Sequence, residues 1–216
     1  MTAQFLHDEN AATGQAFDVA MNANHHGFCS VYLAPLSSAG QGAAWMKIFE
    51  DGYHPDVTAE QIDWSNPAKQ DNADTPFVGW WCTDIARYNG GKVPFTLPAG
   101  VPAGKYILRA EMLTTYLPDT VPTAQAYLGC SVVQVGAEGA ATEAQTLPGA
   151  VALPAAYEGA DWIYYDLHKE YVNGKIPGAP GPEVWDGSGA GGGSTPSIAS
   201  PVPVAPVRRR MRRGLR

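Results

Sequence analysis

Two stretches decide the fold class: Lys105-Tyr-Ile-Leu-Arg-Ala-Glu-Met-Leu113 and Gln125-Ala-Tyr-Leu-Gly-Cys-Ser-Val-Val-Gln-Val135. In each of them apolar residues recur at nearly every second position. The turn-rich segment Pro98-Ala-Gly-Val-Pro-Ala-Gly104 comes just before the first. Runs of period two bounded by glycine and proline are typical of antiparallel β-strands.

Shorter runs of the same kind lie upstream, and no segment carries a helical stripe longer than three turns. The expected strands contain Phe17, Val19 and Met21, then residues 28–34, then residues 45–49, then Val93, Phe95 and Leu97. Residues 51–79 and 117–123 show little pattern and are expected to be loops. The sequence therefore predicts an all-β fold, an antiparallel β-sandwich with long loops.

Length and composition indicate one folded domain followed by a tail. The chain has 216 residues, of which 45% are apolar and 16% charged, as in folded globular proteins. After Trp185 the sequence becomes rich in glycine, serine and proline, and it ends in an arginine cluster. We expect a β-sandwich domain over residues 1–187, and a linker with a disordered Arg-rich tail over residues 188–216.

The net charge of −7 combines two regions of opposite sign. Residues 188–216 hold six arginines and no acid, which leaves 8 basic against 21 acidic residues in the rest, about −13. An acidic body argues against binding to nucleic acid or to an anionic membrane, and it permits a neutral polysaccharide partner. The basic tail has two interpretations: a localisation or anion-binding patch, or a solvated end without function.

Cysteine count and the start of the chain bear on the compartment. Three cysteines, Cys29, Cys82 and Cys130, exclude a four-cysteine zinc site and leave at least one thiol without a partner in the chain. The first residues have neither a basic region nor an apolar core, so no signal peptide is expected, and this start alone indicates a cytosolic protein. There is also no apolar run of 18 or more residues that would predict a membrane helix.

One constellation of residues suits metal chemistry. His25-His26-Gly27 precedes a predicted strand, while Gln125 and Tyr127 are two residues apart and so project from one face of another strand. Imidazole nitrogen together with a phenol oxygen suits copper. The simpler alternative is that the histidines are turn residues and Tyr127 an ordinary strand tyrosine. G-x-S-x-G and H-E-x-x-H motifs are absent, and a glycosidase carboxylate pair cannot be tested from sequence.

Six blocks, in order, resemble the fungal cellulose-active lytic polysaccharide monooxygenases, auxiliary activity family 9, formerly glycoside hydrolase family 61. The resemblance runs from about Phe17 to Trp185 and implies an immunoglobulin/fibronectin-like arrangement of the sandwich. It also implies copper-dependent cleavage of glycosidic bonds in cellulose, with oxidation at C1 or C4. The blocks are residues 25–35, 45–53, 89–98, 102–111, 124–130 and 176–185.

The family's site transfers to this chain residue by residue. By resemblance, His25 and Tyr127 are copper ligands, the second histidine of the brace and the axial tyrosine. Gln125 corresponds to the outer glutamine that positions the oxygen species, and Tyr116 stands where the family has an outer histidine. The resemblance further implies secretion, crystalline cellulose or a related β-glucan as substrate, an external electron donor, and a monomer.

Three departures from the family lead us to expect an N-terminally truncated or degenerate chain that is inactive or poorly folded in this form. The brace histidine at the N-terminus and the family's first strand are missing. Tyr116 replaces a histidine and cannot cycle as an imidazolium ion near neutral pH. Cys130 matches a family half-cystine whose partner would lie near Leu6, where there is no cysteine. Cys29 and Cys82 are free to pair with each other.

Other residues and two other functions remain open. His7 lies away from the expected brace, and His54 and His168 are expected on the surface. Tyr171 is a candidate for stacking on sugar rings or for plain packing. The competing functions are a degenerate, non-catalytic carbohydrate- or copper-binding β-sandwich, and an unrelated intracellular interaction protein whose basic tail is a localisation signal.

Overall fold

The fold is known from a computed structural model that describes residues 1–4, 25–55, 80–88, 91–115, 124–136, 144–145, 147–159 and 178–188. Most of the secondary structure in these residues is β-strand. The expected strand around Phe17 to Met21 and most of the long segment 51–79 lie outside them. The boundary between domain and tail at residues 187 and 188 stays a prediction, because residues 189–216 lie outside them as well.

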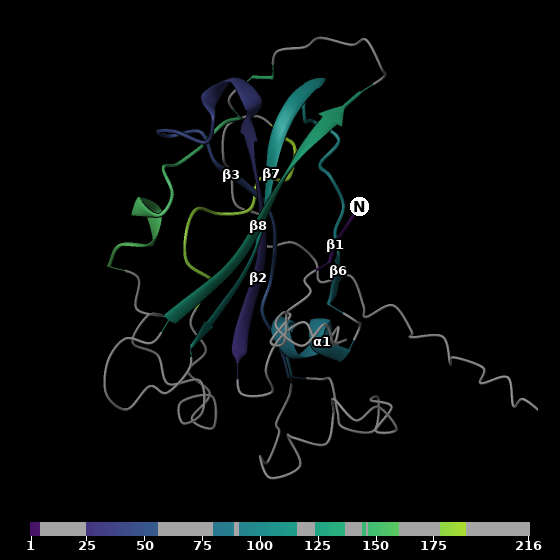
Figure 1. Ribbon diagram of the computed structural model, residues 1–216, viewed down its shortest axis with the longest axis vertical. Helices are drawn as coiled ribbons and strands as arrows, with labels where there is room; N and C mark the ends of the chain where they lie inside the picture. The colour runs from purple at the N-terminus through teal and green to yellow at the C-terminus, as the bar shows by residue number, and fades with distance from the viewer. Residues whose placement is uncertain are drawn as a thin grey trace, which may run out of the picture.

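Four long strands form the main sheet, in the order β3-β2-β7-β8, with every neighbouring pair antiparallel (Figure 1). They are β2 (His26–Pro35), β3 (Met46–Asp51), β7 (Gly104–Thr115) and β8 (Ala124–Val135). These are the four strands that the alternating runs predict, each with nearly the expected bounds.

Two small sheets and short helices surround the main sheet. Strand β1 (Thr2–Gln4) pairs with β6 (Lys92–Pro94), and β4 (Tyr53–His54) pairs with β5 (Trp80–Trp81). Helix α1 (Cys82–Tyr88) follows β5 directly, and 3-10 turns occupy η1 (Leu36–Ser38) and η4 (Ala155–Tyr157). The strand predicted to reach Leu97 ends at Pro94, and the next residue, Phe95, still donates its N–H to the Met1 carbonyl at 3.0 Å and accepts from the Met1 amine at 2.9 Å.

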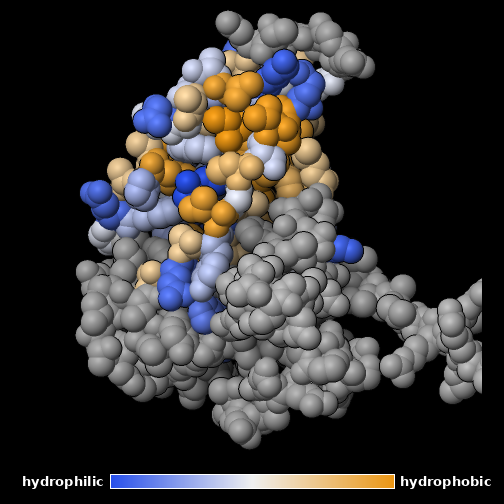
Figure 2. All heavy atoms as spheres, in the orientation of Figure 1, coloured by the Kyte–Doolittle hydropathy of each residue, from blue (hydrophilic) through white to orange (hydrophobic). Residues whose placement is uncertain are grey.

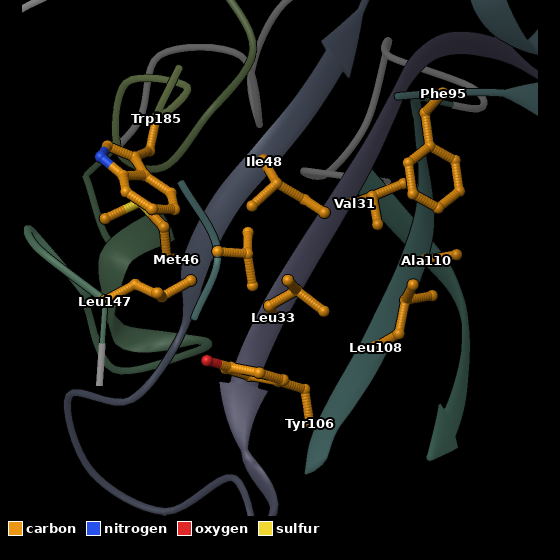
Figure 3. Packing of buried hydrophobic residues seen from close by; sticks show 11 residues of the cluster. Val31, Leu33, Met46, Ile48, Phe95, Tyr106, Leu108, Ala110, Leu147 and Trp185 are labelled. Carbon is orange, nitrogen blue, oxygen red and sulfur yellow. The ribbon is translucent and has the colours of Figure 1, made fainter. Parts of the chain in front are cut away.

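The main core packs on one face of this sheet (Figure 3). Strand β7 alternates there as its sequence predicts: Tyr106, Leu108 and Ala110 are buried, while Lys105 is exposed. Apolar side chains from outside the main sheet pack against this face and complete the core layer. The cluster consists of Val31, Leu33, Met46, Ile48, Phe95, Val101, Tyr106, Leu108, Ala110, Leu147 and Trp185.

A polar network is buried on the opposite face. Glu111 is fully buried; it accepts hydrogen bonds from the guanidinium of Arg109 and, at 2.5 Å, from the hydroxyl of Tyr157. The Tyr157 and Tyr32 hydroxyls lie 2.9 Å apart, and burial raises the pKa of both phenols, so that both stay protonated. Each buried charge in this network therefore has a partner, as a stable interior requires.

The segment 178–188 is fixed to β3 through Lys47. The buried ammonium of Lys47 donates to the carbonyl of Pro180 at 2.8 Å and to the Glu50 carboxylate at 2.7 Å, and the Lys47 carbonyl accepts from Trp185 N–H at 2.9 Å. The last described segment thus closes over the sheet at the position where the sequence predicts the end of the domain.

Strand β8 is one of the two edge strands of the main sheet among the described residues, and it carries exposed apolar side chains. Leu128 is 50% and Val132 is 62% exposed. Figure 2 shows apolar atoms gathered on the face of the sheet that is viewed there.

In the part of the chain that the structure describes, none of the helices has the length and apolar character of a membrane span.

A disulfide joins Cys29 of β2 to Cys82, the first residue of α1. Both half-cystines are buried, with exposed fractions of 1% and 2%, and they lie 53 positions apart along the chain. Cys130 on β8 is an exposed free cysteine. The pairing that the sequence leaves open is therefore present in the structure.

Removing this disulfide is expected to destabilise the protein. Because the bridge closes a loop of 53 residues, the double variant Cys29→Ala/Cys82→Ala should lose about 4 kcal/mol of unfolding free energy in urea titrations. Cys130→Ser, at an exposed position, should change the unfolding free energy by less than about 0.5 kcal/mol. Equal stability of the double variant and the parent would contradict a structural role for the bridge.

Candidate metal centre

The structure brings three of the four predicted site residues together at one end of the main sheet. His25 stands immediately before β2, and Gln125 and Tyr127 lie on β8. His25 Nε2 is 3.0 Å from Gln125 Oε1, and the Tyr127 hydroxyl donates to the same oxygen at 2.6 Å. The His25 and Tyr127 rings meet edge to face with their centroids 5.8 Å apart.

Strand register explains how residues 100 positions apart meet. Gly27 of β2 is opposite Thr114 of β7, and Thr114 is opposite Gln125 of β8, so one row crosses three strands. Side chains two residues apart on a strand share a face, which places Tyr127 beside Gln125 as the spacing predicts. Gln125, the last residue of this row, therefore lies next to His25.

Gly27 is required by this row. A Cβ atom at position 27 would lie 1.8 Å from the carbonyl oxygen of Leu113, far inside any allowed contact. The glycine therefore allows β2 and β7 to approach closely where the histidine pair begins, and a larger residue would push the strand start away.

The other predicted site residues are not brought to this cluster in the described structure. Tyr116 lies outside the described residues, as do His7, His168 and Tyr171. His54 is described and lies on β4, where its Nε2 is 2.6 Å from Asp51 Oδ1. Its side chain is only 12% exposed, so it is more buried than the sequence predicts.

Next to the cluster lies a buried histidine–aspartate pair that sequence reasoning missed. His26 Nδ1 is 2.8 and 3.0 Å from the two carboxylate oxygens of Asp84, and one of these oxygens also accepts from Trp81 N–H at 3.0 Å. His26 is 6% and Asp84 2% exposed. The doubled histidine was the only local signal, because Asp84 belongs to a seven-residue helix that shows no recognisable pattern.

The donor atoms at this end of the sheet are of types that copper binds. An imidazole nitrogen and a phenol oxygen both point at one position, now held by the Gln125 carbonyl oxygen, and copper accepts both types of ligand. Thr114, in the same row, has a buried hydroxyl that lacks a hydrogen-bond partner among the described residues. The part of the chain that the structure describes holds no group of three or more His, Cys, Asp or Glu side chains suited to a metal.

Gln125 competes with any metal for His25. In the neutral imidazole a nitrogen that donates to an amide oxygen carries the proton, whereas a metal-binding nitrogen must present its lone pair. Metal binding through Nε2 therefore requires the proton to leave that nitrogen and the Gln125 side chain to swing aside.

The His54–Asp51 contact predicts a pH dependence of stability. The hydrogen bond to Asp51 raises the pKa of His54 above its ordinary value, against the opposing effect of burial. A raised folded-state pKa stabilises the fold most fully below the unfolded pKa of about 6.5, and this contribution disappears as pH rises through the folded pKa. His54→Gln should therefore lose unfolding free energy relative to the parent at pH 5 and match it more closely at pH 9, measured by urea unfolding; the same difference at both values would contradict this.

The fold and the cluster together define a class: an antiparallel β-sandwich with an imidazole, a phenol and an amide gathered at one end of its main sheet. Comparison with known families agrees. The family model described as "Auxiliary Activity family 9 (formerly GH61)" matches residues 3–174. The chain belongs to Auxiliary Activity family 9.

Several relatives carry the name AA9 family lytic polysaccharide monooxygenase A. The protein of that name from Aspergillus niger is 33% identical over 175 residues, which cover 81% of this chain and 35% of that protein. The one from Aspergillus terreus is 33% identical over 177 residues, covering 82% of this chain and 41% of that protein. The chain thus spans less than half the length of these curated relatives.

Solved structures support the fold. CvAA9A is similar with a TM-score of 0.58 and 25% identity, over 79% of this chain and 67% of that one. The crystal structure of HiLPMO9B is similar with a TM-score of 0.51 and 24% identity, over 76% of this chain and 64% of that one. The predicted all-β class, an immunoglobulin-like antiparallel β-sandwich, is confirmed.

Proposed function

We propose that the protein is a copper-dependent lytic polysaccharide monooxygenase that cleaves glycosidic bonds in cellulose or a related β-glucan by oxidation. The observation that carries the proposal is the meeting of His25, Gln125 and Tyr127 at one end of a family 9 sandwich. The acidic body suits a neutral polysaccharide, and the Cys29–Cys82 disulfide suits an oxidising, extracellular compartment. The enzyme is proposed to act as a secreted monomer supplied by an external electron donor.

Each residue of the cluster has a part in this proposal. Copper, when bound, supplies the reactivity with O2 or H2O2 that leads to hydroxylation at C1 or C4 of the sugar. His25 would hold the copper through an imidazole nitrogen, and Tyr127 would offer its phenol oxygen as a second, weaker ligand. Gln125 fixes the Tyr127 hydroxyl and has amide N–H donors that would orient the oxygen co-substrate. Tyr116 is proposed as a further outer hydrogen-bond donor in place of the family's histidine.

The second candidate is a degenerate, non-catalytic carbohydrate- or copper-binding β-sandwich. The observation that favours it is the engagement of His25 Nε2 by Gln125, since an amide that occupies the ligand position weakens metal uptake. The two candidates differ in whether oxidised sugars are formed.

Copper binding tests the proposed ligands. His25→Ala should weaken Cu(II) binding by at least about tenfold, measured by calorimetric titration of the full chain, because it removes a nitrogen ligand. Tyr127→Phe should change the Cu(II) electron paramagnetic resonance spectrum with a smaller loss of affinity, since axial ligands bind weakly. His54→Gln is the matched control and should bind as the parent does. Parent-like affinity in His25→Ala would exclude His25 as a ligand.

Activity tests the reaction itself. The copper-loaded full chain, given ascorbate, H2O2 and amorphous cellulose, separates the two candidates: an enzyme releases oligosaccharides oxidised at C1 or C4, detected by mass spectrometry, and a degenerate copy releases none. His25→Ala should abolish them, while His54→Gln should not. Copper binding without oxidised products would instead support the non-catalytic alternative.

A further inference from the structure

The first three residues of α1 hold the start of β2 through three separate contacts. Cys82 is bonded to Cys29, the Thr83 hydroxyl lies 3.5 Å from the Gly27 carbonyl oxygen, and the Asp84 carboxylate binds His26 Nδ1 at 2.8 Å. A disulfide, a weak polar contact and an imidazole–carboxylate hydrogen bond thus run in parallel between two short segments. We call residues 82–84 the α1 clamp.

The clamp is itself rigidly placed. Asp84, in the first turn of α1, accepts a hydrogen bond from the backbone N–H of Trp81, the residue before the helix, as the carboxylate of a capping box does. Cys82 N–H donates to the Gly52 carbonyl at 2.7 Å, which ties the helix start to the chain between β3 and β4. All three clamp residues are buried, with exposed fractions of 1 to 2%.

The same contacts reach both sides of the proposed metal centre. Consecutive side chains of an extended chain point in opposite directions, so that fixing His26 toward Asp84 places the His25 side chain on the other side of the backbone, where its Nε2 meets Gln125 of β8. On the other side, Cys29, Cys82 and Met112 belong to a buried cluster against which Tyr127 packs. The clamp therefore influences the position of the His25 imidazole through the backbone and the position of the Tyr127 phenol through packing.

We propose that the α1 clamp positions His25 for metal binding, with His26 and Asp84 as positioning residues that touch neither metal nor substrate. The inference rests on the proposed function, because it takes His25 to be a ligand. The buried contact between the His26 imidazole and both oxygens of the Asp84 carboxylate holds the backbone at residues 25 and 26. A small displacement of this backbone would move the ligating nitrogen of His25. Partners that orient ligands in this way change metal affinity by about 10- to 100-fold when they are removed.

The test compares Asp84→Ala and Asp84→Asn in the full chain, with Leu108→Val as a matched core variant near the middle of β7, away from the row of Thr114. Asp84→Ala should weaken Cu(II) binding by about tenfold. It should also shift the His25 imidazole nitrogen signals of the metal-free protein in long-range 1H–15N spectra. Asp84→Asn keeps an acceptor oxygen for His26 and should restore part of both. Leu108→Val should lower the melting temperature but leave the copper affinity and the His25 signals unchanged.

The outcomes separate this inference from the proposed function. If the parent chain takes up no Cu(II), the proposed function fails, and the His25 signals alone then decide whether the clamp positions this ring. If the parent binds copper and Asp84→Ala binds it equally well, the inference is overturned, whatever happens to the melting temperature. A loss of affinity in Leu108→Val as large as in Asp84→Ala also overturns it, because general destabilisation would then explain both.

Discussion

The pairing of β2 with β7 and of β7 with β8 is the constraint on which the rest of the structure depends. Its register puts Gly27, Thr114 and Gln125 in one row, and a shift of one residue would turn every side chain of the shifted strand to the other face. The close approach at Gly27 leaves no room for a side chain, which ties the register to the histidine pair. Both the core and the candidate metal centre follow from this alignment.

The two faces of the main sheet are stabilised in different ways. One face buries aliphatic and aromatic side chains, among them Leu33, Tyr106 and Leu108. The other buries charged groups that are stable there only as a set, with Glu111 held between Arg109 and Tyr157. Lys47 belongs to this second face and joins the segment 178–188 to it, so that polar contacts place the end of the described chain. The hydrophobic effect stabilises both layers, since Phe28, Trp45 and Leu113 belong to a buried cluster on the second face, and satisfied hydrogen bonds complete that second layer.

Local pattern predicted the strands well and the contacts between distant segments poorly. Alternation in residues 105–113 and 125–135 predicted β7 and β8 nearly to the residue. The spacing of Gln125 and Tyr127 gave their shared face. Helix α1 and the His26–Asp84 pair were missed, since seven residues are too few for a helical period and the partners lie 58 positions apart. The Cys29–Cys82 pairing stayed open for the same reason: three cysteines have no preferred pair until the chain is folded.

The disulfide between Cys29 and Cys82 determines whether the protein comes apart when a peptide bond between these residues is cleaved. The segment between them includes residues 30–81, and a protease cut at any one peptide bond in it would leave two polypeptides still joined by the bridge. The piece that carries His25 would then remain attached to the piece that carries Gln125 and Tyr127. Such a nicked protein would run as one species on a gel until a reductant is added, and only then as two.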